Sequence, residues 1–337
     1  MRPMQVSEFN PPQLAGQRLM VGFDGIRLNS DLRHLITTLK IGGVILFARN
    51  ISGPEQLLEL SCAIQETARK VGMPPLFIAI DQEGGLVARL REPFTLLPGA
   101  SKMKDLNTVR RYAGITAYEL NGVGINMNMA PVMDVAPENI QSIMAERSFG
   151  PDPQRVSEMG VQIIEQLQQN NIMAVAKHFP GIGRTTLDSH LDKPTLAIGL
   201  DILKTADLIP FQAAITGGVA GMMLSHIFYD QIDSRWPASL SPKIAERLLR
   251  NEMGFDGVVM TDDLDMGAIK KHYDIQTVVK QILSAGIDIA MICHKGPDIE
   301  TAYQEILKSI TDSPTVHAKC RTSVQRILKL KHQYLSF

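Results

Sequence analysis

Residues 173–179 read MAVAKHF and residues 257–263 read GVVMTDD, and these two stretches decide the fold. Each is mostly apolar until it nears its carboxyl end, where polar side chains follow. A strand that is covered on both faces has this pattern, because neither face meets water. Six further runs are of the same kind, and we predict eight strands: Leu19–Phe23, Gly43–Phe47, Leu76–Asp81, Asn126–Val132, Met173–Phe179, Gly221–Ile227, Gly257–Asp263 and Ile287–Cys293.

Segments with helical character alternate with these runs. Alternation of strands and helices indicates a parallel sheet, and eight such units predict an α/β fold, a closed (β/α)₈ barrel of the TIM type, as one domain over residues 1–337. An open doubly wound sheet is the alternative, but residues 22–25 (GFDG) lack the GxGxxG spacing that usually follows its first strand. A last helix, about residues 313–333, is expected to pack on the barrel. The other predicted helices are Pro54–Val71, Lys104–Gly122, Pro153–Asn170, Leu200–Thr216, Ser241–Glu252 and Ile275–Ala285.

The composition excludes several classes of protein. Lys and Arg number 34 and Asp and Glu 35, so the net charge of −1 argues against nucleic acid or an anionic membrane as the partner. The three cysteines lie far apart without a CxxC pair, which is typical of a reducing compartment. The amino-terminal region has no apolar run of signal-peptide length, and no stretch of about 20 apolar residues occurs. We therefore expect a cytoplasmic protein with no membrane segment.

Polar side chains gather at the carboxyl ends of the predicted strands, the end of a barrel where active sites are built. Carboxylates together with a lysine, an arginine and histidines suit recognition of a polyhydroxylated ligand, and they also suit covalent or acid–base catalysis by carboxylates. The GxxxxGK[ST], HExxH and GxSxG motifs are absent. The residues concerned are Asp81, Glu83, Asp134, Arg147, Lys177, His178, His226, Asp262 and Asp263.

Two loops after strand ends, residues 134–150 and 180 to about 195, are longer than usual, and long loops at this end are usually functional. The second contains Asp188 and His190, which lie two residues apart and can reach one side of an extended segment. A carboxylate beside an imidazole orients the ring and raises its basicity, so the pair could transfer protons. An Asx-type turn with an exposed histidine is the alternative, and spacing alone favours it.

The segment Lys177-His-Phe-Pro-Gly-x-Gly-x₄-Asp188-Ser-His190 resembles the signature of glycoside hydrolase family 3. The rest of the chain is similar to the single-domain β-N-acetylglucosaminidase branch of that family, and the resemblance covers nearly its whole length. The other matching motifs follow in the family's order at residues 43–50, 81–85, 128–135, 147–150 and 254–264.

The resemblance implies a retaining double displacement with no metal and no cofactor. By motif position, Asp262 is the nucleophile, and His190, paired with Asp188, is the general acid/base. The substrate that the resemblance implies is a small carbohydrate, namely N-acetylglucosamine-bearing peptidoglycan fragments in cell-wall recycling, and the protein is expected to be a monomer. The residues implied to bind the terminal N-acetylglucosamine are Asp81, Arg89, Arg147, Lys177 and His178.

Residue chemistry agrees with these roles. Asp262 ends a buried strand and would be rigid, as a nucleophile must be. Asp263 points to the opposite side of an extended strand, so we expect it to cap the next helix or to bond to neighbouring backbone. Arg147 is a long donor that can hold sugar hydroxyls, or it can pair with Asp134 across its loop.

Three positions depart from the family pattern. Ile182 stands where histidine is usual, Leu86 stands where arginine is common, and Arg184 adds a positive charge to the loop. Two rival functions therefore stay open. One is a phosphorylase, in which phosphate replaces water and the added arginine tolerates the anion. The other is a sugar-binding protein without turnover.

Overall fold

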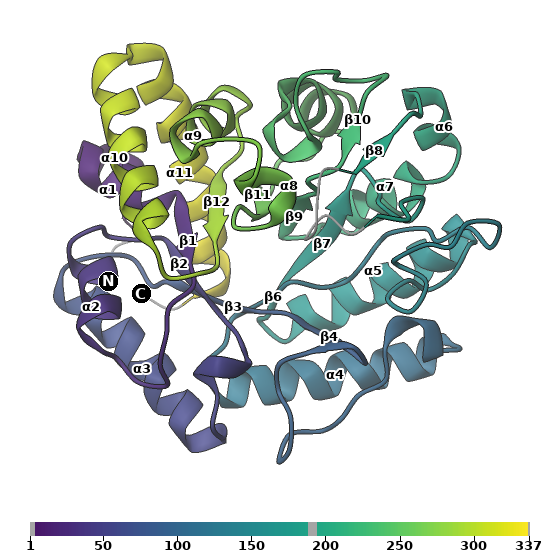
Figure 1. The fold of residues 1–337 in the computed structure, drawn as a ribbon. Helices are drawn as coiled ribbons and strands as arrows, with labels where there is room; N and C mark the ends of the chain where they lie inside the picture. The colour runs from purple at the N-terminus through teal and green to yellow at the C-terminus, as the bar shows by residue number, and fades with distance from the viewer. Residues whose placement is uncertain (1–3, 188–193, 336–337) are drawn as a thin grey trace.

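The computed structural model describes residues 4–187 and 194–335. Within them, eight parallel strands close into a barrel whose order is the order of the chain, which confirms the predicted (β/α)₈ fold in a single domain (Figure 1). The barrel strands are β1 (Leu19–Val21), β2 (Gly43–Leu46), β3 (Phe77–Ile80), β6 (Met127–Asn128), β7 (Met173–Phe179), β9 (Gly221–Leu224), β11 (Val258–Asp263) and β12 (Ile289–Ile292).

Most strands are a little shorter than predicted, and β6 differs most. The sequence predicts a strand from Asn126 to Val132, whereas regular pairing ends at Asn128. Pro131 has no N–H to donate, so the ladder cannot continue through it. Val132 then meets Lys177 of β7 as an isolated bridge. Two short pairs lie outside the barrel: β4 (Gln82–Gly84) with β5 (Val87–Ala88), and β8 (Thr195–Leu196) with β10 (Phe228–Tyr229).

The helices surround the strands (Figure 1). Those that begin or end within about two residues of their predicted bounds are α3 (Pro54–Lys70), α4 (Leu106–Gly122), α5 (Pro153–Gln169), α9 (Ile275–Ser284), the π-helix η5 (Lys243–Glu252) and α11 (Pro314–Tyr334). Helices that the sequence analysis did not predict are α1 (Pro11–Gln17), α2 (Ser30–Thr37), α8 (Gly267–Lys270) and α10 (Pro297–Asp312).

One helix prediction was wrong. Residues 200–216 form two helices, α6 (Leu200–Thr205) and α7 (Leu208–Thr216), instead of one. Pro210 lies in the first turn of α7, where its missing N–H would be unbonded in any case. The same proline in the middle of one long helix would remove a hydrogen bond and clash with the preceding turn.

The interior of the barrel is rich in methionine, whose flexible side chain fills irregular space. The interior methionines are Met20, Met127, Met129, Met173, Met223, Met260 and Met291. Ile327 and Leu330 of α11 join this cluster. Lys331 of the same helix donates to Gln17 Oε1 at 2.8 Å and to the Gly42 carbonyl at 2.9 Å, both just before a strand begins. Helix α11 therefore closes the amino-terminal end of the barrel.

Within the described part of the chain, no helix combines the length and the apolar character that a membrane span requires.

Candidate active site

The predicted site residues that the structure describes come together where the barrel strands end. Asp81 directly follows β3, Lys177 and His178 lie in the carboxyl-terminal half of β7, and Asp262 lies in β11. Arg89 directly follows β5 of the short hairpin after β3 and reaches back to Asp81. Because the carboxyl ends of parallel strands lie at one end of a barrel, these side chains lie together at that end.

Lys177 is the centre of an ion network. Its Nζ lies 2.8 Å from Asp81 Oδ1 and 2.6 Å from Glu83 Oε1, and Arg89 Nη2 donates to Asp81 Oδ2 at 3.1 Å. Burial by itself lowers the pKa of Lys177, but the two carboxylates outweigh it and raise that pKa above its ordinary value. Burial likewise raises the pKa of Asp81, and Lys177 and Arg89 outweigh it, so that pKa lies well below its usual range. Lys177 and Asp81 are therefore both charged at neutral pH.

Arg147 and Glu83 form a bidentate ion pair. Its Nε donates to Glu83 Oε2 at 2.9 Å and its Nη2 donates to Glu83 Oε1 at 2.7 Å. Planar two-bond pairing of this kind fixes the guanidinium plane. The alternative in which Arg147 pairs with Asp134 was wrong, because Asp134 is bonded to His178 instead.

His178 is held between a carboxylate and a cation. Its Nδ1 lies 2.8 Å from Asp134 Oδ2, and its Nε2 lies 3.4 Å from Arg147 Nη2. A carboxylate only accepts, so Nδ1 carries the proton in the neutral ring and Nε2 presents its lone pair toward Arg147. Asp134 is fully buried and also accepts from the Ile182 N–H at 2.8 Å.

Asp262 carries an ionised carboxylate at neutral pH. Burial raises its pKa, but the imidazoles of His178 and His226, the N–H of Asp263 and the charge of Lys177 outweigh burial and leave that pKa below its ordinary value. The Asp263 N–H donates to Asp262 Oδ1 at 2.8 Å. A rigid, ionised and largely buried carboxylate is what covalent catalysis by a carboxylate requires.

The neighbouring carboxylate has a structural role, which confirms the expectation for Asp263. Its Oδ1 accepts from the N–H groups of Asp265 and Cys293, each at 3.0 Å. Its main-chain carbonyl lies 2.8 Å from His226 Nε2. Asp263 therefore ties the end of β11 to the residues around it, whereas Asp262 lies close to His178, His226 and Lys177.

The first part of the second long loop is fixed by buried contacts. Gly183 passes so close to the main chain of Val135 that a Cβ there would lie 1.8 Å from the Val135 carbonyl oxygen. Arg184 Nε donates to Asp207 Oδ2 at 2.8 Å, and Asp207 is fully buried. The charge that Arg184 adds to the loop is therefore paired.

Asp188 and His190 lie outside the described residues, which end at Leu187 and resume at Pro194. Their assignment to proton transfer stays a prediction.

Three further residues of the site follow strand ends in the sequence, but the sequence does not identify the contacts that they make in the structure. Glu83 lies two residues after Asp81, so both side chains fall on one side of an extended segment, and this spacing is the signal that could have linked them to one lysine. Asp134 and His226 are the other two, and which side chains they contact depends on packing between strands far apart in the chain.

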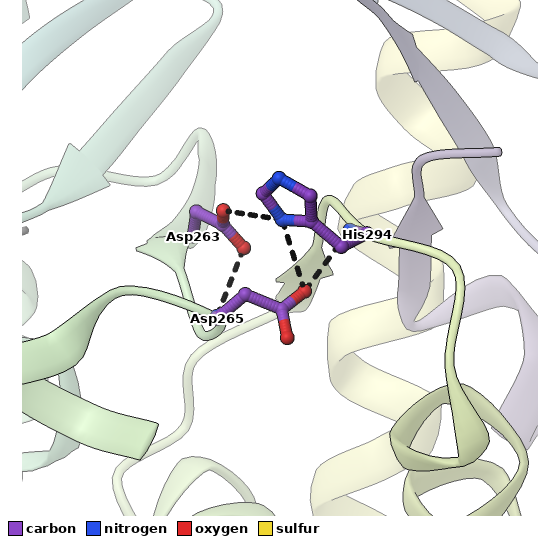
Figure 2. Close-up of side chains that lie close together, drawn as sticks. All are labelled: Asp263, Asp265 and His294. Atoms are coloured by element: carbon purple, nitrogen blue, oxygen red, sulfur yellow. Dashed lines mark hydrogen bonds and ion pairs between the residues drawn. The ribbon is translucent and has the colours of Figure 1, made fainter. Parts of the chain in front are cut away.

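Groups that could hold a metal ion lie next to Asp262 in the chain and at the end of the neighbouring strand β12. Among the described residues, Asp263, Asp265 and His294 bring one ligand atom each within 4.8 Å of the others (Figure 2).

Comparison with known proteins gives consistent findings. Residues 12–330 match the model of the glycosyl hydrolase family 3 N terminal domain. A beta-hexosaminidase of Nitrosomonas eutropha is 33% identical over 324 residues, which cover 93% of this chain and 91% of that protein.

Solved structures extend the comparison. A family 3 β-N-acetylglucosaminidase of Paenibacillus sp. is 35% identical with a TM-score of 0.91, and the match covers 97% of this chain but only 63% of that longer chain. NagZ of Neisseria gonorrhoeae, solved with N-trifluoroacetyl-D-glucosamine, is 27% identical with a TM-score of 0.74 over 92% of this chain and 98% of that one.

Proposed function

This chain belongs to glycosyl hydrolase family 3 and is a glycoside hydrolase, and from that premise we propose that it is an exo-acting β-N-acetylglucosaminidase that releases terminal N-acetylglucosamine with retained configuration. The observation that carries the proposal is Asp262, an ionised carboxylate at the end of a buried strand. The same end of the barrel also holds the ion network of Lys177, Asp81 and Glu83.

The reaction has two displacements at the anomeric carbon, C1. In the first, a carboxylate oxygen of Asp262 bonds to C1 while the bond from C1 to the leaving oxygen breaks, and His190 gives that oxygen its proton. In the second, water attacks C1 and passes a proton to His190, and the bond between C1 and Asp262 breaks. Each displacement inverts C1, so the product has the configuration of the substrate. The low pKa of Asp262 supports its role, because only the anion is a nucleophile.

In the proposed complex, the terminal N-acetylglucosamine contacts the ion network of Lys177, Asp81 and Glu83. Lys177 uses two of its three N–H groups on Asp81 and Glu83, so one remains for a sugar hydroxyl. Asp81 and Arg89 hold each other and can each bind a further hydroxyl group. Glu83 fixes Arg147, so the guanidinium needs little reordering when a sugar binds.

Peptidoglycan fragments that end in N-acetylglucosamine are the substrates we propose, acted on by a monomer in the cytoplasm during cell-wall recycling. The names of the relatives support the sugar. Phosphorolysis has less support than the sequence alone suggested, because Asp207 already pairs with Arg184.

The deciding experiment is to trap the intermediate with a 5-fluoro N-acetylglucosaminyl fluoride and to locate the added mass after proteolysis. We expect it on the peptide that contains Asp262 and expect none on Asp262→Ala. A tag on another carboxylate would overturn the nucleophile assignment. Proton NMR of the product first formed distinguishes retention from inversion. Assay in phosphate buffer distinguishes free sugar, which we expect, from sugar 1-phosphate. Binding of N-acetylglucosamine without cleavage would support the sugar-binding rival.

A further inference from the structure

A second group of polar side chains lies at the ends of β11 and β12. Asp263 ends β11, Asp265 follows it by two residues, and His294 follows β12, the strand paired with β11 (Figure 2). His294 Nδ1, Asp263 Oδ2 and Asp265 Oδ2 point toward one another. The imidazole has 62% of its side-chain surface exposed, so solvent reaches the group from outside.

The distances between these atoms are too long for direct hydrogen bonds. His294 Nδ1 lies 3.6 Å from Asp263 Oδ2 and 3.5 Å from Asp265 Oδ2. Nitrogen–oxygen hydrogen bonds in proteins are about 2.7–3.2 Å long. Two ligand atoms bound at about 2.0–2.1 Å to a tetrahedral ion lie about 3.3–3.4 Å apart. The spacing therefore matches shared ligation of an ion better than direct contact.

Hydrogen bonds from main-chain N–H groups fix the orientation of the two carboxylates. Asp263 Oδ1 accepts from the N–H groups of Asp265 and Cys293, which leaves Oδ2 facing His294. Asp265 Oδ2 also accepts from the His294 N–H at 3.0 Å.

We propose that Asp263, Asp265 and His294 form a binding site for a divalent transition-metal ion, with Zn²⁺ as the best match. One imidazole and two carboxylates suit Zn²⁺, whereas Mg²⁺ and Ca²⁺ prefer oxygen ligands alone. Three protein ligands leave the fourth position to water. The ion would join the ends of β11 and β12 and stabilise the fold. The proposed hydrolysis uses no metal, so a failure of the metal-site proposal would leave the proposed function unaffected, and the reverse is also true.

Lys270 gives the site a competitor. Its Nζ binds Asp265 Oδ1 and also lies 3.3 Å from Asp298 Oδ2. A cation already on one carboxylate weakens the binding of another, so replacing Lys270 with methionine should tighten Zn²⁺ binding several-fold. A site that does not involve Asp265 would not respond in this way.

The test is calorimetric titration of the full chain with ZnCl₂ after chelator treatment, with Co²⁺ absorption as a readout of coordination. We expect His294→Asn to weaken binding by at least roughly tenfold and to remove the visible Co²⁺ bands. His317→Asn, which removes a histidine from α11, is the matched control and should bind as the parent does. At a hundredfold excess of Zn²⁺ over its Kd, the parent should melt about 4 °C higher, and His294→Asn should not.

Three results would overturn the proposal. One is an absence of Zn²⁺ binding by the parent at millimolar concentration. Another is equal binding by His294→Asn and His317→Asn, which would locate the ion elsewhere. The third is preferential binding of Mg²⁺ or Ca²⁺ that His294→Asn leaves unchanged. If His294→Asn does not fold, Lys270→Met serves as the test. Equal Zn²⁺ affinity in Lys270→Met and the parent would then overturn the proposal.

Discussion

Replacing Glu83 with glutamine would test the ion network at the mouth of the barrel. The substitution keeps the shape of the side chain, removes one negative charge and turns one acceptor into a donor. In the structure, both oxygens of Glu83 accept from cations: Oε1 from Lys177 and Arg147, and Oε2 from Arg147. Glutamine offers one oxygen, so its NH₂ group would face a lysine or arginine donor.

The size of the effect follows from burial. Glu83 and Lys177 have only 7% and 2% of their side-chain surfaces exposed, so water compensates little for a lost partner. Removing one member of a buried ion pair costs about 3–5 kcal/mol. Asp81 still holds Lys177 in the variant, so we take the lower end, about 3 kcal/mol. For 337 residues, this loss lowers the melting temperature by about 4 °C.

The loss should depend on pH in a defined direction. Burial raises the pKa of Glu83, but Lys177 and Arg147 outweigh burial and hold that pKa below its ordinary value of 4.5. A carboxyl whose pKa falls on folding stabilises the fold above its unfolded pKa, and this contribution is lost as the pH falls through the folded pKa. The difference in melting temperature between Glu83→Gln and the parent should therefore be full at neutral pH and shrink as the pH falls below 4.5.

Activity gives the second readout. Glu83→Gln frees Arg147, which we propose to hold the sugar, so kcat/KM for a nitrophenyl β-N-acetylglucosaminide should fall by about 100-fold, the factor that 3 kcal/mol represents. Glu146→Gln, which changes an exposed acid one residue before Arg147, is the matched control and should behave as the parent. Parent-like melting and parent-like kcat/KM in Glu83→Gln would refute the reasoning.

Three further substitutions test other parts of the molecule. Asp262→Ala should lower turnover by roughly 10⁴-fold or more while the protein still folds, and near-parent activity would reject its role as nucleophile. His190→Ala should slow sugar leaving groups more than nitrophenyl ones, because nitrophenolate leaves without a proton, and equal losses would exclude the acid role. Burial lowers the pKa of Lys331 from 10.5 to about 7. The unfolded chain therefore binds more protons at Lys331 between these pH values, and the contribution of this residue to the free energy of unfolding should rise by roughly 4 kcal/mol as the pH rises from 7 to 10.5. Lys331→Met should lack this slope in denaturant melts, and equal slopes would contradict the argument.

The barrel could be predicted from the sequence because its strands are covered on both faces. Residues 173–179 had to be apolar over most of their length, and β7 has these bounds. The missed helices carried local start signals: α1 follows Asn10, which accepts from the Gln13 N–H, and α2 follows Asn29, which accepts from the Leu32 N–H. The break between α6 and α7 at residues 206–207 is harder to predict. A proline such as Pro210 can end one helix or lie in the first turn of the next, and the local sequence does not distinguish these cases.

The sequence indicated which residues come together at the candidate site, but it did not indicate which of them contact one another. Motif order identified Asp81, Arg89, Lys177 and Asp262, and the structure places them at one end of the barrel. The sequence leaves open which acid Arg147 binds. Glu83 and Asp134 are both acids that could pair with Arg147. Packing between the strands decides the outcome, in which Glu83 binds Arg147 and Asp134 binds His178.

Asp134 explains why the departure at Ile182 is compatible with the rest of the site. The carboxylate holds the loop through the main-chain N–H of Ile182 and holds His178 through Nδ1. A main-chain contact does not depend on which side chain occupies the position, so isoleucine replaces the usual histidine without breaking it. Ile182 is itself buried, 5% exposed, and joins the hydrophobic core. One buried acid thus fixes both the ring of His178, which we propose to contact the sugar, and the point where the loop leaves β7. A change at Asp134 should therefore disturb substrate binding and proton transfer together, whereas a change at Ile182 should act through packing alone.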